Sequence, residues 1–332
     1  MEPTLVTSEW VKSRIAEGTH ASKVVDCSWF LVPPSSPHRP VLAGAAYFDV
    51  DDVADRSEDK SPSPHMLPSP DQFAAWMDRH GITPDDHVLL YDHSNGLLTA
   101  SARVWWTFRV FGHGRVSVLE GGYAGWPAGL EIPAQWRIVV PSDVPSGAAP
   151  ASYPASYHPE LVWGQEDVLK HIVSAGKQDD GRRHILLDAR PGERFLGQAG
   201  EPRRGVPSGS VPGSVSFPFP QLFRKVERTN ERGEVEAVHL LKSREELVEL
   251  FAQRGVPIAD KSGEQTHDEV AVAAMCGSGV TACPLALVLY TFGRPDVPIY
   301  DGSWTEWAFT AHPKQHLQQL PPDVVPLRKY HH

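Results

Sequence analysis

The stretch EVAVAAMCGSGVTACPLALVLYTF, residues 269–292, predicts a buried strand, a loop and a buried helix in that order. Residues 270–275 form an apolar run of strand length. Residues 281–292 predict a helix that tolerates Pro284 in its first turn, because a backbone N–H there has no helical partner in any case. Cys276 and a short glycine-rich run separate the two elements. This order is typical of an α/β sheet.

Cys276 falls at the expected carboxyl end of that strand, which is where ligands bind in open α/β sheets. Gly277 and Gly279 allow successive backbone N–H groups to converge on an anion. The N-terminus of the following helix adds positive potential. Both effects favour the thiolate, which is the nucleophilic form of cysteine. A structural cysteine beside a tight turn is the alternative, and the strand–loop–helix context favours the nucleophile.

The composition bounds the class of protein. The 332 residues are 41% hydrophobic and 22% charged, which indicates a globular chain of about two domains. A net charge of −10 argues against nucleic acid or an anionic membrane as partner. Three cysteines are a small and odd number, which argues against a disulfide scaffold, and they lack the spacing of a metal site. The first residues, MEPTLVTSEW, resemble neither a secretory signal nor an Arg-rich leader, so we expect a cytoplasmic location with the mitochondrion as alternative.

The chain contains an internal repeat. SNGLLTA at residues 94–100 aligns with CGSGVTA at residues 276–282, and the dipeptide Phe-Gly at 111–112 recurs at 292–293. Self-similarity at this distance predicts a duplicated α/β domain, each copy a mostly parallel sheet flanked by helices. The predicted parts are an N-terminal domain at 1–135, a Pro-, Ser- and Ala-rich linker at 136–154, a C-terminal domain at 155–312 and a polar tail at 313–332.

The two copies differ at the candidate nucleophile. Ser94 stands where the second copy has Cys276, and a serine without a suitably placed base is a poor nucleophile. We therefore expect the first domain to be chemically silent. Residues 161–172, LVWGQEDVLKHI, predict a helix. Residues 227–238, ERTNERGEVEAV, predict a solvated, charged insertion that forms neither a strand nor a site.

Over residues 5–310 the chain resembles the tandem-rhodanese sulfurtransferases of the 3-mercaptopyruvate type. The motifs that carry the resemblance are FDVD (48–51), HMLP (65–68), DARPGERF (188–195), GEPR (200–203), CGSGVTA (276–282) and YDGSW (300–304). The resemblance implies a covalent persulfide on Cys276, with no separate cofactor and no metal. Sulfur would pass from 3-mercaptopyruvate to thioredoxin, a small thiol or cyanide. It also implies a monomer.

By motif position the resemblance implies particular site residues. Arg194 and Arg203 would clamp the substrate carboxylate, for which a bidentate guanidinium is well suited. Asp188 and Arg190 are interpreted as a brace at a strand end. Backbone of the loop would contact the substrate at Gly277, Gly279, Val280 and Thr281.

A serine, a histidine and an aspartate have been proposed as a proton relay in this branch, and here they are Ser278, His65 and Asp51. His is the side chain whose pKa suits proton transfer near neutral pH. The alternative role for His65 is to pack at the domain interface. The alternative role for Ser278 is to donate a hydrogen bond to the substrate or the persulfide. Asp51 has nearby carboxylates as alternatives, namely Asp49, Asp52 and Asp55.

The loop also favours one donor and one reaction class. Gly277, Ser278 and Gly279 are neutral, whereas thiosulfate sulfurtransferases of the family carry cations there, so we expect 3-mercaptopyruvate as the main donor and thiosulfate as the alternative. A cysteine phosphatase needs an arginine to close its loop, and residues 277–282 contain none. A non-catalytic rhodanese module is disfavoured by the presence of Cys276. Cys283 is expected to be a small core residue, with a resolving thiol as alternative.

Overall fold

The computed structural model describes residues 2–18, 21–31, 40–57, 61–138, 152–174, 181–229, 233, 235–258 and 269–310. By internal contacts the chain divides into two compact units, and neither is continuous in sequence. Unit 1 comprises the described residues of 1–55, 67–158 and 223–241, and unit 2 those of 56–66, 159–222 and 242–332. The predicted tail and most of the predicted linker lie outside the described residues. The predicted domain boundaries stay predictions.

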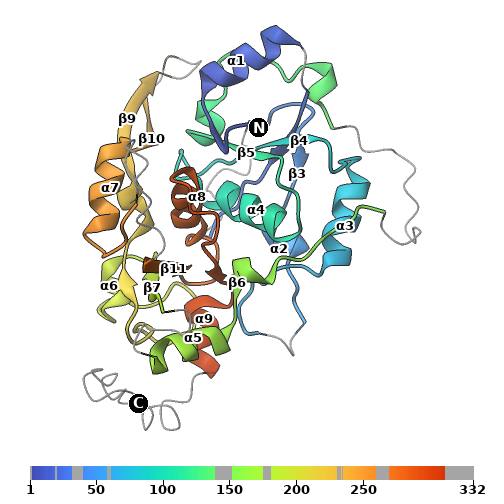
Figure 1. Ribbon diagram of the computed structural model, residues 1–332. Helices are drawn as coiled ribbons and strands as arrows, with labels where there is room; N and C mark the ends of the chain where they lie inside the picture. The colour runs from blue at the N-terminus through green and yellow to red at the C-terminus, as the bar shows by residue number, and fades with distance from the viewer. Residues whose placement is uncertain are drawn as a thin grey trace. The chain divides into compact units, whose positions relative to one another are not determined.

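Unit 1 is built on a five-stranded sheet in which every pairing is parallel and the order is β1-β5-β4-β2-β3. Figure 1 labels three of these strands, β3, β4 and β5. The central strand is fully buried, as its apolar sequence predicts. The strands are β1 (Leu5–Val6), β2 (Ser22–Asp26), β3 (Ala46–Tyr47), β4 (His87–Tyr91) and β5 (Val116–Leu119). The helices are α1 (Ser8–Glu17), α2 (Val50–Val53), α3 (Pro70–Arg79) and α4 (Thr99–Val110).

Unit 2 repeats this topology in an all-parallel sheet of order β6-β12-β11-β7-β8. The strands are β6 (Val162–Trp163), β7 (Arg183–Asp188), β8 (Val215–Ser216), β11 (Val270–Met275) and β12 (Ile299–Tyr300). The helices are α5 (Gln165–Val173), α6 (Gly192–Phe195), α7 (Arg244–Ala252), α8 (Cys283–Thr291) and α9 (Ser303–Thr310). In both units the loop that aligns in sequence follows the middle strand of the sheet. The predicted duplicated α/β fold with parallel sheets flanked by helices is confirmed.

The stretch 269–292 folds as its pattern predicts. All six residues of β11 are buried, and β11 pairs with β7 from Val270↔Arg183 to Met275↔Asp188. The helix begins at Cys283, two residues later than expected, with proline in its first turn. Its apolar side chains are buried. Burial of the central strand on both faces explains why the sequence reads as continuous apolar runs instead of alternation.

The prediction that residues 227–238 form no strand was wrong. Most of them lie in an antiparallel hairpin of β9 (Phe223–Thr229) and β10 (Val235–Leu241). Charged residues on β9 indicated solvation, but backbone pairing over seven residue pairs outweighs the low strand propensity of Glu and Lys. The base of the hairpin is tied into unit 1, since Leu241 N donates to Glu120 Oε1 at 3.1 Å.

The predicted helix at 161–172 is also partly wrong, because Val162–Trp163 form the short strand β6 beside β12. The helix begins only at Gln165, after Gly164. A two-residue strand is too short to show a period, so the pattern of residues could not separate it from the helix that follows.

Among the described residues, none of the helices combines the length and the apolar character that crossing a membrane requires.

Two buried histidines of unit 1 make its stability depend on pH. Each ring nitrogen of His87 is hydrogen-bonded to a serine hydroxyl. Nδ1 lies 2.8 Å from Ser22 Oγ, and Nε2 lies 2.8 Å from Ser117 Oγ. His113 Nδ1 lies 2.8 Å from Tyr153 Oη. Burial lowers the pKa of His87 to about 3 and that of His113 to about 4. The unfolded chain therefore binds protons below pH 6.5 that the folded unit does not bind.

We predict that the free energy of unfolding falls as the pH drops from 6.5 toward 4, by up to about 1.4 kcal/mol per pH unit for each histidine. His87→Gln should lessen this slope, whatever its effect on stability at pH 7. Urea unfolding of both proteins at pH 7, 6 and 5 measures the two slopes. Equal slopes would show that other groups cause the acid sensitivity.

Candidate active site

Cys276 follows β11 and is buried at the carboxyl end of the unit 2 sheet, with 1% of its surface exposed. Its backbone N–H donates to Ser303 Oγ at 3.1 Å, and its carbonyl accepts from Trp304 N at 3.0 Å. Both backbone polar groups of the candidate nucleophile are therefore bonded to the start of α9. This fixes the main chain at the position from which the thiol projects.

The start of α9 holds the next residue of the loop as well. Thr305 donates to the Gly277 carbonyl from its N–H at 3.0 Å and from Oγ1 at 2.6 Å. Ser303 has a φ of 52°, in the left-handed region that a residue with a side chain rarely adopts. Its Oγ donates to Tyr300 O at 2.7 Å, which locks the hydroxyl that receives the Cys276 N–H. Strained residues of this kind are typical of functional sites.

Arg194 and Arg203 both reach the loop, as the sequence predicts for substrate-binding cations. A Cβ atom placed on Gly277 would lie 3.1 Å from Arg194 Nη2 and 3.8 Å from Arg203 Nη1. Glycine at this position therefore lets two guanidinium groups approach the backbone beside Cys276. A substrate carboxylate close to the thiol would meet positive charge from both.

Arg194 is held by a buried chain of charges. Both Arg194 and Arg190 donate to the Glu201 carboxylate, the latter from Nη1 at 2.8 Å. Arg190 in turn binds both oxygens of Asp188, from Nε at 3.0 and 3.1 Å and from Nη2 at 2.6 Å. The guanidinium of Arg190 also lies 4.7 Å from the ring of Trp304. Asp188 and Arg190 thus form the brace that the sequence predicts.

Glu201 was missed by the sequence reasoning. It lies in the GEPR motif, and its side chain is only 3% exposed. Glu201 is therefore a buried partner of two arginines and not a solvated surface charge. Ser303 and Thr305 were also missed, and the YDGSW motif with the residues after it was the available signal. Ser303 and Thr305 contact residues that are 27 and 28 positions away in sequence, whereas the partners of Glu201 are only 7 and 11 positions away. In each case the motif marks the residue, but the sequence does not identify the contact.

His65 and Ser278 come together although they are 213 residues apart in sequence, since segment 56–66 belongs to unit 2. His65 Nδ1 lies 2.9 Å from Ser278 Oγ, and both side chains are buried. Arg203 Nη2 lies 3.5 Å from the same nitrogen. A hydroxyl hydrogen-bonded to a histidine is an arrangement that can move a proton, and Ser278 is two residues after Cys276 in sequence.

Asp51, the third predicted member of the relay, is a residue of α2 in unit 1. Its Oδ2 accepts from Trp29 Nε1 at 2.9 Å, and its backbone N–H donates to Asp49 Oδ1 at 2.8 Å. Its role in a relay stays a prediction.

The rest of the loop leads into α8. Gly279 has a φ of 78°, which requires glycine or costs strain. Val280 is buried, and Thr281 is half-buried. Cys283 donates from Sγ to the Gly279 carbonyl at 3.2 Å and is buried at the start of the helix. This supports the interpretation of Cys283 as a core residue. All three cysteines are free thiols.

The aligned loop in unit 1 is filled by a side chain of its own. Asp92 accepts from Ser94 N at 3.0 Å and Ser94 Oγ at 2.5 Å through one oxygen. Its other oxygen accepts from Ser101 N and Oγ, both at 2.8 Å. The loop is also bonded to β10, where His239 N donates to Asn95 O at 2.8 Å. These contacts give a physical reason for the predicted silence of the first domain. The alignment of Ser94 with Cys276 was wrong in register, because Tyr91 pairs with Asp26 as Met275 pairs with Asp188, so Asp92 holds the position of Cys276.

Comparison with known proteins agrees with this architecture. The Rhodanese-like domain family matches residues 7–128. The chain is 35% identical over 322 residues to 3-mercaptopyruvate sulfurtransferase of Rattus norvegicus, which covers 95% of each chain. It is 36% identical over 324 residues to thiosulfate/3-mercaptopyruvate sulfurtransferase 1, mitochondrial, of Arabidopsis thaliana, which covers 92% of this chain and 76% of the relative.

Among solved structures, the crystal structure of SseA from Escherichia coli superposes with a TM-score of 0.61 at 30% identity. It covers 92% of this chain and 100% of that one, and it is described as showing the rhodanese fold and catalytic mechanism of 3-mercaptopyruvate sulfotransferases. Fold and site together define a rhodanese-type enzyme with a cysteine nucleophile. The chain belongs to the tandem-rhodanese sulfurtransferases.

We predict that Glu201→Gln lowers the free energy of unfolding by about 3–5 kcal/mol, since it leaves two buried or half-buried guanidinium groups without their shared charge. It should also raise the KM for the sulfur donor, because Arg194 loses the carboxylate that positions it. Chemical denaturation and steady-state kinetics measure the two effects.

Glu193→Gln is the control, because Glu193 is exposed in the same segment and should change stability by less than about 0.5 kcal/mol. Equal behaviour of the two variants would contradict the role given to Glu201.

Proposed function

We propose that this protein transfers sulfur from 3-mercaptopyruvate through a persulfide on Cys276 to a thiol acceptor, releasing pyruvate. The observation that carries the donor choice is the neutral loop after Cys276 with two arginines beside Gly277. The relatives from rat and Arabidopsis are named for the same donor.

The reaction runs in two displacement steps. The Cys276 thiolate attacks the sulfur of the donor, the donor C–S bond breaks, and its electron pair leaves as the enolate of pyruvate. A proton on the enolate carbon completes pyruvate and leaves Cys276 as a persulfide. An acceptor thiolate then attacks the outer sulfur, the S–S bond breaks, and the Cys276 thiolate is restored. Thioredoxin, a small thiol and cyanide are the candidate acceptors.

The charge of the loop favours a monoanionic donor. Residues 277–279 are neutral and add no cation beside Cys276. A doubly charged donor such as thiosulfate loses most from that absence, whereas the single carboxylate of 3-mercaptopyruvate needs fewer cations. Thiosulfate remains the second candidate donor, because the Arabidopsis relative is named for both.

The proton for the enolate is assigned to Ser278 and His65. The hydroxyl and the imidazole lie within hydrogen-bond distance of each other, and Ser278 is two residues from the nucleophile. A group that delivers a proton in the transition state contributes about 10²–10⁴-fold. Asp51 is the third residue that the family resemblance implies for this relay. The substrate-contacting roles of Gly277, Gly279, Val280 and Thr281 belong to the same proposal.

The monomeric state and the cytoplasmic location stay predictions. The Arabidopsis relative is named as mitochondrial, so the family includes that compartment.

The test of the donor is steady-state sulfur transfer with 3-mercaptopyruvate and with thiosulfate on one preparation. We expect kcat/KM to favour 3-mercaptopyruvate at least tenfold, which corresponds to about 1.4 kcal/mol of transition-state preference. Cys276→Ser should abolish transfer from both donors with the fold retained. A preference for thiosulfate would overturn the donor, and residual turnover of a few per cent in Cys276→Ser would overturn the persulfide.

The test of the relay uses the chemical difference between the donors. Ser278→Ala and His65→Gln should lower kcat with 3-mercaptopyruvate by about 10²-fold or more, because its leaving group needs a proton on carbon. Thiosulfate releases sulfite, which needs no such proton, so its turnover should fall far less. An equal fall with both donors would show that the two side chains position the loop and transfer no proton.

A further inference from the structure

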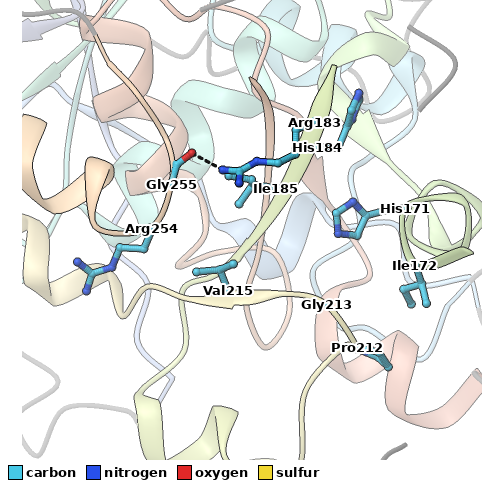
Figure 2. A pocket seen from close by; sticks show the side chains of 10 residues that line it. All are labelled: His171, Ile172, Arg183, His184, Ile185, Pro212, Gly213, Val215, Arg254 and Gly255. Carbon is cyan, nitrogen blue, oxygen red and sulfur yellow. Dashed lines mark hydrogen bonds between the residues drawn. The ribbon is translucent and has the colours of Figure 1, made fainter. Parts of the chain in front are cut away.

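A cavity lies in unit 2, at the opposite end of the sheet from Cys276. Its volume is about 330 Å³, and it is lined by the end of α5, the start of β7, the turn before β8 with the start of that strand, and the turn after α7 (Figure 2). The strand register separates the two ends, since Arg183 pairs with Val270 and Asp188 with Met275. Five residues of strand span about 16 Å, so this cavity is distinct from the catalytic loop.

The cavity exists because β8 is much shorter than β7. β8 pairs with β7 only at Leu187 and Asp188, so no described strand lies beside the residues from Arg183 to Leu186 on that edge. Arg183 and Ile185 alternate with His184 along β7, and all three line the cavity. Because alternate residues point to opposite faces of a sheet, the cavity wraps around the open edge of β7.

His171 supplies a buried polar atom without a partner. Its side chain projects from α5 toward β7, as Figure 2 shows, and it is 3% exposed. Its Nδ1 is buried and makes no hydrogen bond to any residue that the structure describes. An unsatisfied buried nitrogen costs about 1–3 kcal/mol, and a ligand atom in the cavity would remove that cost. Burial lowers the pKa of His171 to about 4, so the ring is neutral at pH 7.

Two arginines make the cavity positive. Arg183 donates from Nη2 to Gly255 O at 2.7 Å, which holds its guanidinium at the wall. Arg254 donates from Nη1 to Leu250 O at 3.0 Å and stacks on Phe217 at 4.5 Å. None of the described lining residues is acidic. The remaining wall is largely apolar, with Ile172, Ile185, Pro212 and Val215.

We propose that this cavity binds a small organic monocarboxylate with an apolar body. The carboxylate pairs with Arg183, because a planar guanidinium is suited to a carboxylate. Arg254 adds positive charge at the rim, since its guanidinium is turned away from the other lining residues in Figure 2 and donates to Gln221 Oε1 at 2.5 Å. The apolar body packs against the isoleucines, and a polar substituent reaches His171 Nδ1. The volume lies at the lower end of the range for small-molecule sites, which limits the ligand to roughly the size of an aryl acid.

Phenylacetate is the probe, and phenylacetamide is its uncharged isostere. We expect calorimetric titration of the full chain to show one phenylacetate site that binds at least tenfold more tightly than phenylacetamide. The double variant Arg183→Gln/Arg254→Gln should lose at least tenfold in affinity for phenylacetate. His171→Phe keeps the ring volume but lacks Nδ1, and it should bind phenylacetate with unchanged affinity yet lose affinity for aryl acids that carry a hydrogen-bonding ring substituent, such as 4-hydroxyphenylacetate.

Two control variants test whether cations outside this cavity account for binding of phenylacetate. Lys170→Gln removes a charge from α5 outside the lining and should leave the affinity within twofold. Arg203→Ala removes the carboxylate-binding arginine of the catalytic loop and should also leave it unchanged. Loss of binding in Arg203→Ala with binding kept in Arg183→Gln/Arg254→Gln would place the probe at the catalytic loop and overturn the proposal. Absence of binding to the parent chain would overturn it too.

The double variant lies outside the catalytic machinery, so its sulfur transfer and its unfolding midpoint report whether it is folded. If it does not fold, Arg183→Gln alone replaces it, and unchanged affinity in that variant would contradict the proposal. Failure of the cavity to bind leaves the persulfide reaction untouched, and loss of sulfur transfer in Cys276→Ser leaves the cavity untouched.

Discussion

The active-site loop depends on one buried carboxylate. Glu201 accepts from both Arg190 and Arg194, and it thereby joins the brace at the end of β7 to an arginine that reaches the loop. Removing two charges from water is costly, and only close pairing with further hydrogen bonds offsets that cost. Arg190 makes such bonds, to Asp188 and to the Gly209 carbonyl at 2.8 Å. The segment that carries Arg194 is therefore fixed to the end of β7 by charge and not by apolar packing.

The same strand end fixes the nucleophile from the other side. β7 and β11 are neighbours, and Asp188 is the pairing partner of Met275, the residue before Cys276. α9 then bonds to the backbone of Cys276 and Gly277 through Ser303, Trp304 and Thr305. A small loop held by backbone bonds has little freedom, so cations and thiol keep one mutual geometry. Such preorganisation is what an electrostatically assisted displacement requires.

The sequence was sufficient for the central strands of the two sheets and insufficient for the short edge strand β6 and the hairpin. The run 270–275 was identifiable because burial on both faces leaves only apolar residues, and the repeat then indicated the topology. Val162–Trp163 were too short to show a period, and the charges of 227–238 concealed a hairpin whose stability comes from backbone pairing. Motifs singled out Arg194 and Arg203. Ser303 and Thr305 were missed because their contacts with the loop are distant in sequence, and Glu201 was missed because its charge suggested a solvated residue.

The two units differ in the side chain that follows the middle strand of the sheet. Tyr91 pairs with Asp26 as Met275 pairs with Asp188, so Asp92 in unit 1 stands where unit 2 has Cys276. The backbone agrees, since Asp92 O accepts from Tyr123 N as Cys276 O accepts from Trp304 N. The carboxylate of Asp92 takes hydrogen bonds from the backbone N–H and the hydroxyl of both Ser94 and Ser101. An anionic substrate would need donors of that kind, so unit 1 carries an internal anion in its place. Unit 2 has a thiol at this position, and the guanidinium groups of Arg194 and Arg203 lie beside the next residue.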